Sequence, residues 1–172
     1  MRRNTRVFVL FLALLCSFGF AQAQPGQIAF EADQSVIDNQ KNFALYTGNV
    51  RITRDGATLT AQSVRFNYAN SGKETSKPTL TTVVAHGGVH ITFEDKTATA
   101  DKAVYDAQTQ TITLTGKEKP ATVTAPQGTT SAGSFTIDRV SGKIEAHKSP
   151  MHRVKTTLKP GQDGLSFPEN KK

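Results

Sequence analysis

The sequence predicts an all-β protein, and three observations support this class. Beyond residue 24, apolar residues alternate with polar ones, and no sustained 3.6-residue period appears. Threonine, valine and isoleucine fill many of these positions, as is typical of strands. Turn signals such as Asp55-Gly56 and Ser141-Gly142 recur at short intervals. We therefore expect about a dozen or more short strands, arranged as a sandwich, a jelly roll or a rolled sheet.

A seven-residue motif recurs within this pattern. Each copy begins with alanine and ends with Asp or Asn, directly after an aliphatic or aromatic residue. The four copies are Ala32–Asp38, Ala61–Asn67, Ala100–Asp106 and Ala132–Asp138. A repeat of about 30 residues indicates stacked units, none of which can bury its apolar face alone. The wider spacing after the second copy predicts an inserted polar loop at 70–79.

The expected strands follow the alternation in chain order. They lie around 27–34, 43–45, 50–52, 59–68, 89–93, 98–100, 112–114, 135–137 and 153–158. The motif-ending residues Asp38, Asn67, Asp106 and Asp138 are expected to cap turns by accepting hydrogen bonds from nearby backbone amides. Calcium binding is the alternative, but it requires several oxygen ligands in one loop. Here the carboxylates occur one per repeat.

One face of the expected strands is apolar and the other is polar, so the apolar faces must meet in an interior. This interior is either an ordinary closed core or a trough that stays partly open to an apolar ligand. We assign contact with such an apolar ligand to the large residues of this face. They are Ile28, Phe30, Val50, Ile52, Leu59, Val64, Phe66, Val89, Ile91, Phe93, Ile112, Leu114, Phe135 and Ile137.

The N-terminus has the pattern of a secretory signal peptide. Three arginines precede an apolar run at 7–20, and Ala21-Gln22-Ala23 fits the cleavage rule. The run is shorter than the roughly 20 residues of a membrane span, although an uncleaved anchor is the competing interpretation. We expect a signal peptide at 1–23, a β-domain at 24–159, a disordered polar tail at 160–172, and export to a bacterial periplasm. Cleavage would remove Cys16, the only cysteine.

The remaining composition argues against catalysis and nucleic-acid binding. No nucleophile elbow, phosphate loop or His-Glu-x-x-His motif occurs. On a strand, His86 and His90 would lie roughly 13 Å apart, too far to share a metal with bonds of about 2 Å. We expect no enzymatic activity, cofactor or metal. The net charge of +7 comes from dispersed residues, which favours either an anionic partner or simple solubilisation over nucleic-acid recognition.

The sequence resembles the LptA/OstA-like family of periplasmic lipopolysaccharide transport proteins over roughly residues 27 to 160. The characteristic segments are Ile28–Asp33 followed by Tyr46–Val50, Ala100–Asp106 followed by Thr111–Gly116, and Arg153–Pro160. The chain departs from the family pattern at Gln62, Gly133 and Lys117. The resemblance implies a twisted β-jelly roll of V-shaped strands with a hydrophobic interior and open ends.

The same resemblance implies the function and the partners. The interior would shield the lipid A acyl chains of lipopolysaccharide, and head-to-tail homo-oligomers would bridge the inner and outer membranes. LptC-like and LptD-like proteins would bind opposite ends, and the protein would be peripheral to membranes. The alternative is a non-transport periplasmic β-solenoid or sandwich that binds a partner protein or a glycan. A closed interior without bound lipid would favour that alternative.

Pairing with other chains is expected at the first and last strands, because unpaired edges invite strand addition. Two different edges produce a heterologous contact that can continue into a filament. The residues assigned to these edges are Gln27, Glu31 and Asp33 at one end, and Val154, Thr156 and Leu158 at the other.

Overall fold

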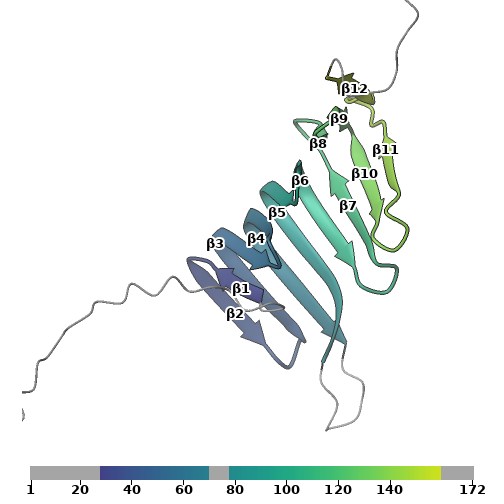
Figure 1. Cartoon of the computed structure of the whole chain (residues 1–172). Coiled ribbons are helices and arrows are strands. Elements are labelled where there is room, and N and C mark those ends of the chain that lie inside the picture. Colours follow the sequence, from purple (N-terminus) through teal and green to yellow (C-terminus); the bar gives the residue numbers. More distant parts are fainter. Residues whose placement is uncertain (1–27, 70–77, 160–172) are drawn as a thin grey trace, which may run out of the picture.

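The computed structural model describes residues 28–69 and 78–159 as an all-antiparallel sheet of twelve strands, which runs as a bent stack from one terminus to the other (Figure 1). The strands are β1 (Ile28–Glu31), β2 (Gln34–Asp38), β3 (Phe43–Arg54), β4 (Ala57–Ala69), β5 (Thr79–Phe93), β6 (Lys96–Asp106), β7 (Thr111–Thr115), β8 (Ala121–Ala125), β9 (Gly128–Ala132), β10 (Ser134–Asp138), β11 (Ile144–His147) and β12 (Lys155–Leu158). The described residues contain no helix capable of crossing a membrane. The expected signal peptide, Gln27, most of the polar loop and the tail lie outside them.

The sheet consists of two arms that share four long strands. Arm 1 has the strand order β1-β3-β4-β5-β6-β8-β9-β12, and arm 2 has the order β2-β3-β4-β5-β6-β7-β10-β11. Each long strand crosses from one arm to the other: Glu31 of β1 pairs with Arg51 in one half of β3, while Ser35 of β2 pairs with Tyr46 in the other half. The resulting cross-section is a V, which confirms the predicted all-β fold of bent strands.

The bend arises where the pairing register shifts. In β3 and β5, shifts occur at Gly48-Asn49 and Gly87-Gly88, and all four residues have positive φ angles. Such backbone favours glycine and, less strongly, asparagine. A β-bulge of this kind bends the strand and increases its twist. Repetition in successive strands turns a local bend into a continuous corner.

In the partner strands, the corner coincides with the start of the repeated motif. Ala61 and Val64 are three residues apart, yet both are buried, and the same holds for Ala132 and Phe135. In a regular strand, residues three apart would point to opposite faces. The motif therefore marks the position at which the side-chain alternation shifts by one residue. This function of the motif was not predicted from the sequence.

Turns close the far ends of arm 2, and three of the four predicted caps are confirmed. Asp38 Oδ1 accepts hydrogen bonds from the backbone N–H groups of Gln40 and Lys41. Asp106 and Asp138 accept equivalent pairs two and three residues onward. Asn67 differs, because its amide donates to Thr82 Oγ1 and accepts from Arg65 Nε. The prediction of a turn cap is thus wrong for Asn67, which ties neighbouring strands together instead.

Threonine forms a continuous row on the outer face of arm 1. Cross-strand partners connect Thr53, Thr58, Thr92, Thr97, Thr124, Thr129 and Thr157 in successive strands. β-Branched side chains pack well against such neighbours on a pleated surface. The polar positions predicted opposite the apolar ones therefore form an ordered outer layer.

The strand boundaries differ from prediction. Four strands are long, with 12 residues in β3, 13 in β4, 15 in β5 and 11 in β6, because each continues through the corner. The expected first strand is divided into β1 and β2 at Ala32-Asp33.

Arg65 lies over the ring of Phe43, at 3.9 Å from its centroid. Phe43 is therefore covered on the outer face, and Ala44 is the buried residue beside it.

Candidate functional site

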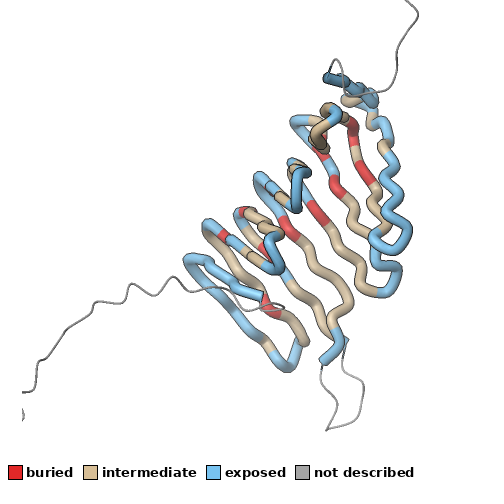
Figure 2. The backbone as a smooth tube through the Cα atoms, viewed as in Figure 1, coloured by how far each residue is buried: buried red, intermediate tan, exposed pale blue. Residues whose placement is uncertain are grey.

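The inner faces of the two arms form an apolar groove along the whole stack. Buried residues follow the corner from strand to strand, as the red segments of Figure 2 show. Side chains nearer the rims, such as Ile52 and Ile112, pack against this buried row but remain partly accessible. At the rim itself Phe93 is 49% exposed. Burial thus decreases from corner to rim, and this gradient defines a groove that opens on one side.

The structure distributes the fourteen predicted lipid-binding residues over three depths of this groove. At the corner, fully buried, lie Val50, Val64, Val89, Leu114 and Phe135. Partly buried against them lie Ile52, Leu59, Phe66, Ile91, Ile112 and Ile137. Exposed at a mouth or rim are Ile28, Phe30 and Phe93. The corner residues build the floor, so contact with a guest falls mainly to the other two groups.

Small residues of the groove were not among the site residues assigned from the sequence. The buried row includes Ala61, Ala85, Ala100, Ala103, Ala121 and Ala132. Where the two arms meet, little space remains for a side chain, and alanine satisfies that limit. The signal was present in the sequence, since alanine opens every copy of the motif. Tyr46, Val83 and Val123 were also missed, and they belong to the partly buried layer.

The C-terminal mouth of the groove is a hollow of about 400 Å³ between the arms. Val123 and Leu158 line it from arm 1, while Phe135 and Ile144 line it from arm 2. Ile144 is 47% exposed and Leu158 is 44% exposed. The hollow is therefore an accessible continuation of the apolar interior.

The N-terminal mouth has a different construction. Phe30 of β1 stacks on Tyr46 of β3, with ring centroids 5.2 Å apart and an interplanar angle of 11°. It also meets Phe66 of β4 edge-on at 5.5 Å. Tyr46 and Phe66 belong to arm 2 and are themselves in edge contact at 5.9 Å. Three aromatic rings thus connect the two arms at this mouth.

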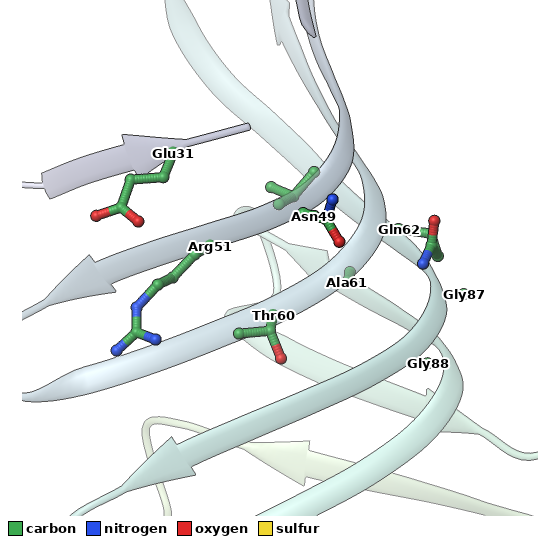
Figure 3. A pocket seen from close by; sticks show the side chains of 9 residues that line it. Glu31, Asn49, Arg51, Thr60, Ala61, Gln62, Gly87 and Gly88 are labelled. Atoms are coloured by element: carbon green, nitrogen blue, oxygen red, sulfur yellow. The ribbon is translucent and has the colours of Figure 1, made fainter. Parts of the chain in front are cut away.

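A second hollow, of about 570 Å³, lies on the outer side of the bend (Figure 3). Its polar side chains are Glu31, Arg51 and Thr60 on one side and Asn49 and Gln62 at the bend, and the rest of the lining is Val50, Ala61, Gly87 and Gly88. Asn49 donates a hydrogen bond to Asp33 Oδ2, which holds the first bulge in place. Within 28–69 and 78–159, no three His, Cys, Asp or Glu side chains cluster closely enough to hold a metal ion. The outer hollow therefore shows neither the apolar lining nor the ligand set of a recognisable site.

Four strands provide free edges at the ends of the stack. β1 and β2 pair only with β3 at one end, whereas β11 pairs only with β10 and β12 only with β9 at the other. The backbone N–H of Lys159 donates to Gln127 O, which lies beside β9. Because backbone groups alternate in direction along a strand, those of Thr156 and Leu158 point away from β9. Val154 precedes β12, and Asp33 lies between β1 and β2, where its backbone N–H donates to Gly48 O.

These features define a class of protein: a bent β-sheet scaffold with an open apolar groove and unpaired strands at both ends. The family described as "LptA/(LptD N-terminal domain) LPS transport protein" matches residues 29–143. That match spans more than half of the chain, so the protein belongs to this family of lipopolysaccharide transport proteins. The resemblance inferred from the sequence motifs is thereby confirmed.

A solved structure supports the fold independently. It is LptH from Pseudomonas aeruginosa, described as the LptA homologous periplasmic component of the conserved lipopolysaccharide transport device. The TM-score is 0.65 at 18% sequence identity, and the similarity covers 78% of this chain and 96% of that one. No curated protein sequence matches the chain significantly. At this level of identity, the structural similarity is evidence for the fold.

Proposed function

We propose that this protein binds lipopolysaccharide in the periplasm, shields its acyl chains in the groove, and helps to carry it between the two membranes. The observation that carries this proposal is the burial gradient of the groove, from the closed corner through the half-buried Ile52 and Ile112 to the exposed rim. A closed core would bury these residues completely. The family membership supplies the ligand class.

The physical reason for such a groove lies in the acyl chains. Each methylene shielded from water contributes about 0.8 kcal/mol, so a lipid with several long chains requires continuous apolar cover to cross an aqueous space. Partly buried side chains on both arms offer that cover. Sugars and phosphates would remain outside the V, where the solvent reaches them.

The strand count of the arms supports the bridging part of the proposal. Each arm has eight strands, and every neighbouring pair is antiparallel, so the first and last strands of an arm run in opposite directions. A second copy related by translation would place its β1 antiparallel to β12 and its β2 antiparallel to β11. Both arms would then continue at the same junction. Strand addition of this kind supplies backbone hydrogen bonds, and a heterologous contact permits further copies.

The remaining parts of the proposal concern location and partners. A cleaved signal peptide at 1–23 would deliver the chain to the periplasm, where it would be peripheral to membranes. An LptC-like protein and an LptD-like protein would pair with opposite ends of the stack through the same free edges. The family membership supports this arrangement.

Site-specific photo-crosslinking tests the lipid-binding part. A photoreactive residue at Ile52 or Ile112, both on the groove wall, should capture lipopolysaccharide in cells. The matched controls are Thr60 and Thr113, which alternate onto the outer face of the same two arms. Capture at the threonines but not at the isoleucines would contradict the proposal. Mass spectrometry of fatty-acyl material bound to the purified protein would distinguish lipid binding from the non-lipid alternative.

Proline at Thr156 tests the bridging part. Thr156→Pro removes a backbone N–H that points to the free side of β12 and leaves the pairing with β9 intact. We expect self-association to weaken by about tenfold or more, since each backbone hydrogen bond contributes about 1 kcal/mol and the ring also obstructs the approaching strand. Thr156→Ala, which retains the N–H, is the control. Equal oligomer size for both variants in light scattering, with unchanged circular dichroism, would refute edge pairing at β12.

A further inference from the structure

The two mouths of the groove are closed to different degrees, and a single side chain causes the difference. Phe30 comes from β1 in arm 1, yet its ring lies against Tyr46 and Phe66 of arm 2. It therefore spans the groove from one arm to the other. At the C-terminal mouth, Leu158 and Ile144 face each other across the hollow of about 400 Å³.

We propose that Phe30 is a gate residue, which closes the N-terminal mouth of the groove and must leave Tyr46 and Phe66 when an apolar chain passes there. This inference rests on the proposed function, because it assumes that an acyl chain occupies the groove. It adds a defined residue that controls passage at one end.

The strand that carries Phe30 is suited to such movement. β1 has four residues, all exposed, and pairs only with β3. Short edge strands with few neighbours open at low free-energy cost. By contrast, Tyr46 and Phe66 lie on the long central strands β3 and β4, which have partners on both sides. When the rings separate, β1 is therefore the part that moves.

The ring contacts also explain what holds the gate closed. Aromatic pairs prefer offset-stacked or edge-to-face geometry at centroid distances of 4.5–7 Å, and all three pairs of this cluster fall within that range. An acyl chain can replace these contacts with its own apolar contacts to Tyr46 and Phe66. The cluster thus closes the mouth reversibly.

Stopped-flow uptake of the apolar fluorophore N-phenyl-1-naphthylamine tests the gate. The control is Val36→Ala, because Val36 lies on the edge strand β2 at the same end, is 55% exposed, and pairs with Leu45 on the face opposite the groove. We expect Phe30→Ala to accelerate uptake about tenfold, the factor that corresponds to 1.4 kcal/mol. Val36→Ala should change the rate less than twofold. Phe30→Leu, which keeps an apolar side chain without stacking, should give an intermediate rate. It replaces Phe30→Ala in the test if Phe30→Ala does not fold.

Tyrosine circular dichroism provides a second readout. The chain has three tyrosines and no tryptophan, so loss of the Phe30–Tyr46 stack should reduce the near-ultraviolet tyrosine signal in Phe30→Ala and not in Val36→Ala. Equal uptake rates for Phe30→Ala and Val36→Ala would overturn the gate while leaving the proposed function intact. If wild type and Phe30→Ala both fail to take up the fluorophore, the apolar-carrier function itself is refuted, and the gate with it.

Discussion

The two ends of the groove share a backbone architecture and differ in their side chains. Both ends consist of short edge strands joined to a corner that the same repeated motif produces. At the N-terminal end, Phe30 connects the arms through aromatic contacts. At the C-terminal end, aliphatic side chains line an open hollow over the buried ring of Phe135. The comparison shows that the repeat sets the shape of the groove, while the edge side chains decide its access.

The largest effect is expected from the aromatic residue below the C-terminal hollow. Phe135 is 1% exposed, so Phe135→Ala should lower the free energy of unfolding by about 3–5 kcal/mol, as for other buried phenylalanines. Phe93→Ala, at the exposed rim, should cost well under half of that. Urea denaturation followed by far-ultraviolet circular dichroism measures both. Similar losses would show that the C-terminal hollow has no rigid floor, and the contrast between the two ends would fail.

The second-largest effect on stability is expected at the corner that both ends share. Gly87→Ala places a methyl group at a φ of 79° and about 2.7 Å from Gln62 Cβ. Gly88→Ala, at a φ of 60°, meets nothing within 4 Å, so it carries the backbone cost of about 1 kcal/mol without the crowding. We expect Gly87→Ala to destabilise the protein by about 1–3 kcal/mol, more than Gly88→Ala. Equal losses of unfolding free energy in urea denaturation would mean that crowding at the corner has no influence on stability.

The smallest effect concerns the turns of arm 2, which are alike at both ends. Hydrogen bonds from the backbone N–H groups of Lys41 and Gln40 lower the pKa of Asp38 below its usual range. Hydrogen bonds from Ser141 and then Val140 lower the pKa of Asp138 in the same way. A lowered folded-state pKa contributes stability at pH values above the unfolded-state pKa, and that stability is lost as the pH falls through the folded-state pKa.

Asp38→Asn and Asp138→Asn should therefore each reduce the dependence of stability on pH in the acid range. Both residues lie at the surface with intermediate exposure, so the two reductions should be small and similar. Thermal melting between pH 5 and pH 2.5 checks this expectation. A much larger reduction for one variant would reveal a difference between the turns at the two ends.

Several features were predictable from the sequence because they depend on neighbours along the chain. The alternation predicted the inward direction of residues such as Ile52 and Ile112, and the motif-ending aspartates predicted the caps at Asp38, Asp106 and Asp138. The failure at Asn67 has a local cause, since the following segment departs from the repeat. In the strand expected at 43–45, the buried residue is the small Ala44 and not one of its larger neighbours, Phe43 and Leu45.

What the sequence by itself determined was the class of the fold, its repeat and the family. These follow from side-chain period, turn chemistry and motif, which are properties of short segments. Only the tertiary structure decided that Ala61, Ala100 and Ala132 lie at a corner, that Phe30 reaches Tyr46 across the groove, and that the C-terminal mouth is open. Those facts depend on where separate strands lie in space. The alternation along one strand specifies which face a residue occupies, but it does not specify the distance between two faces.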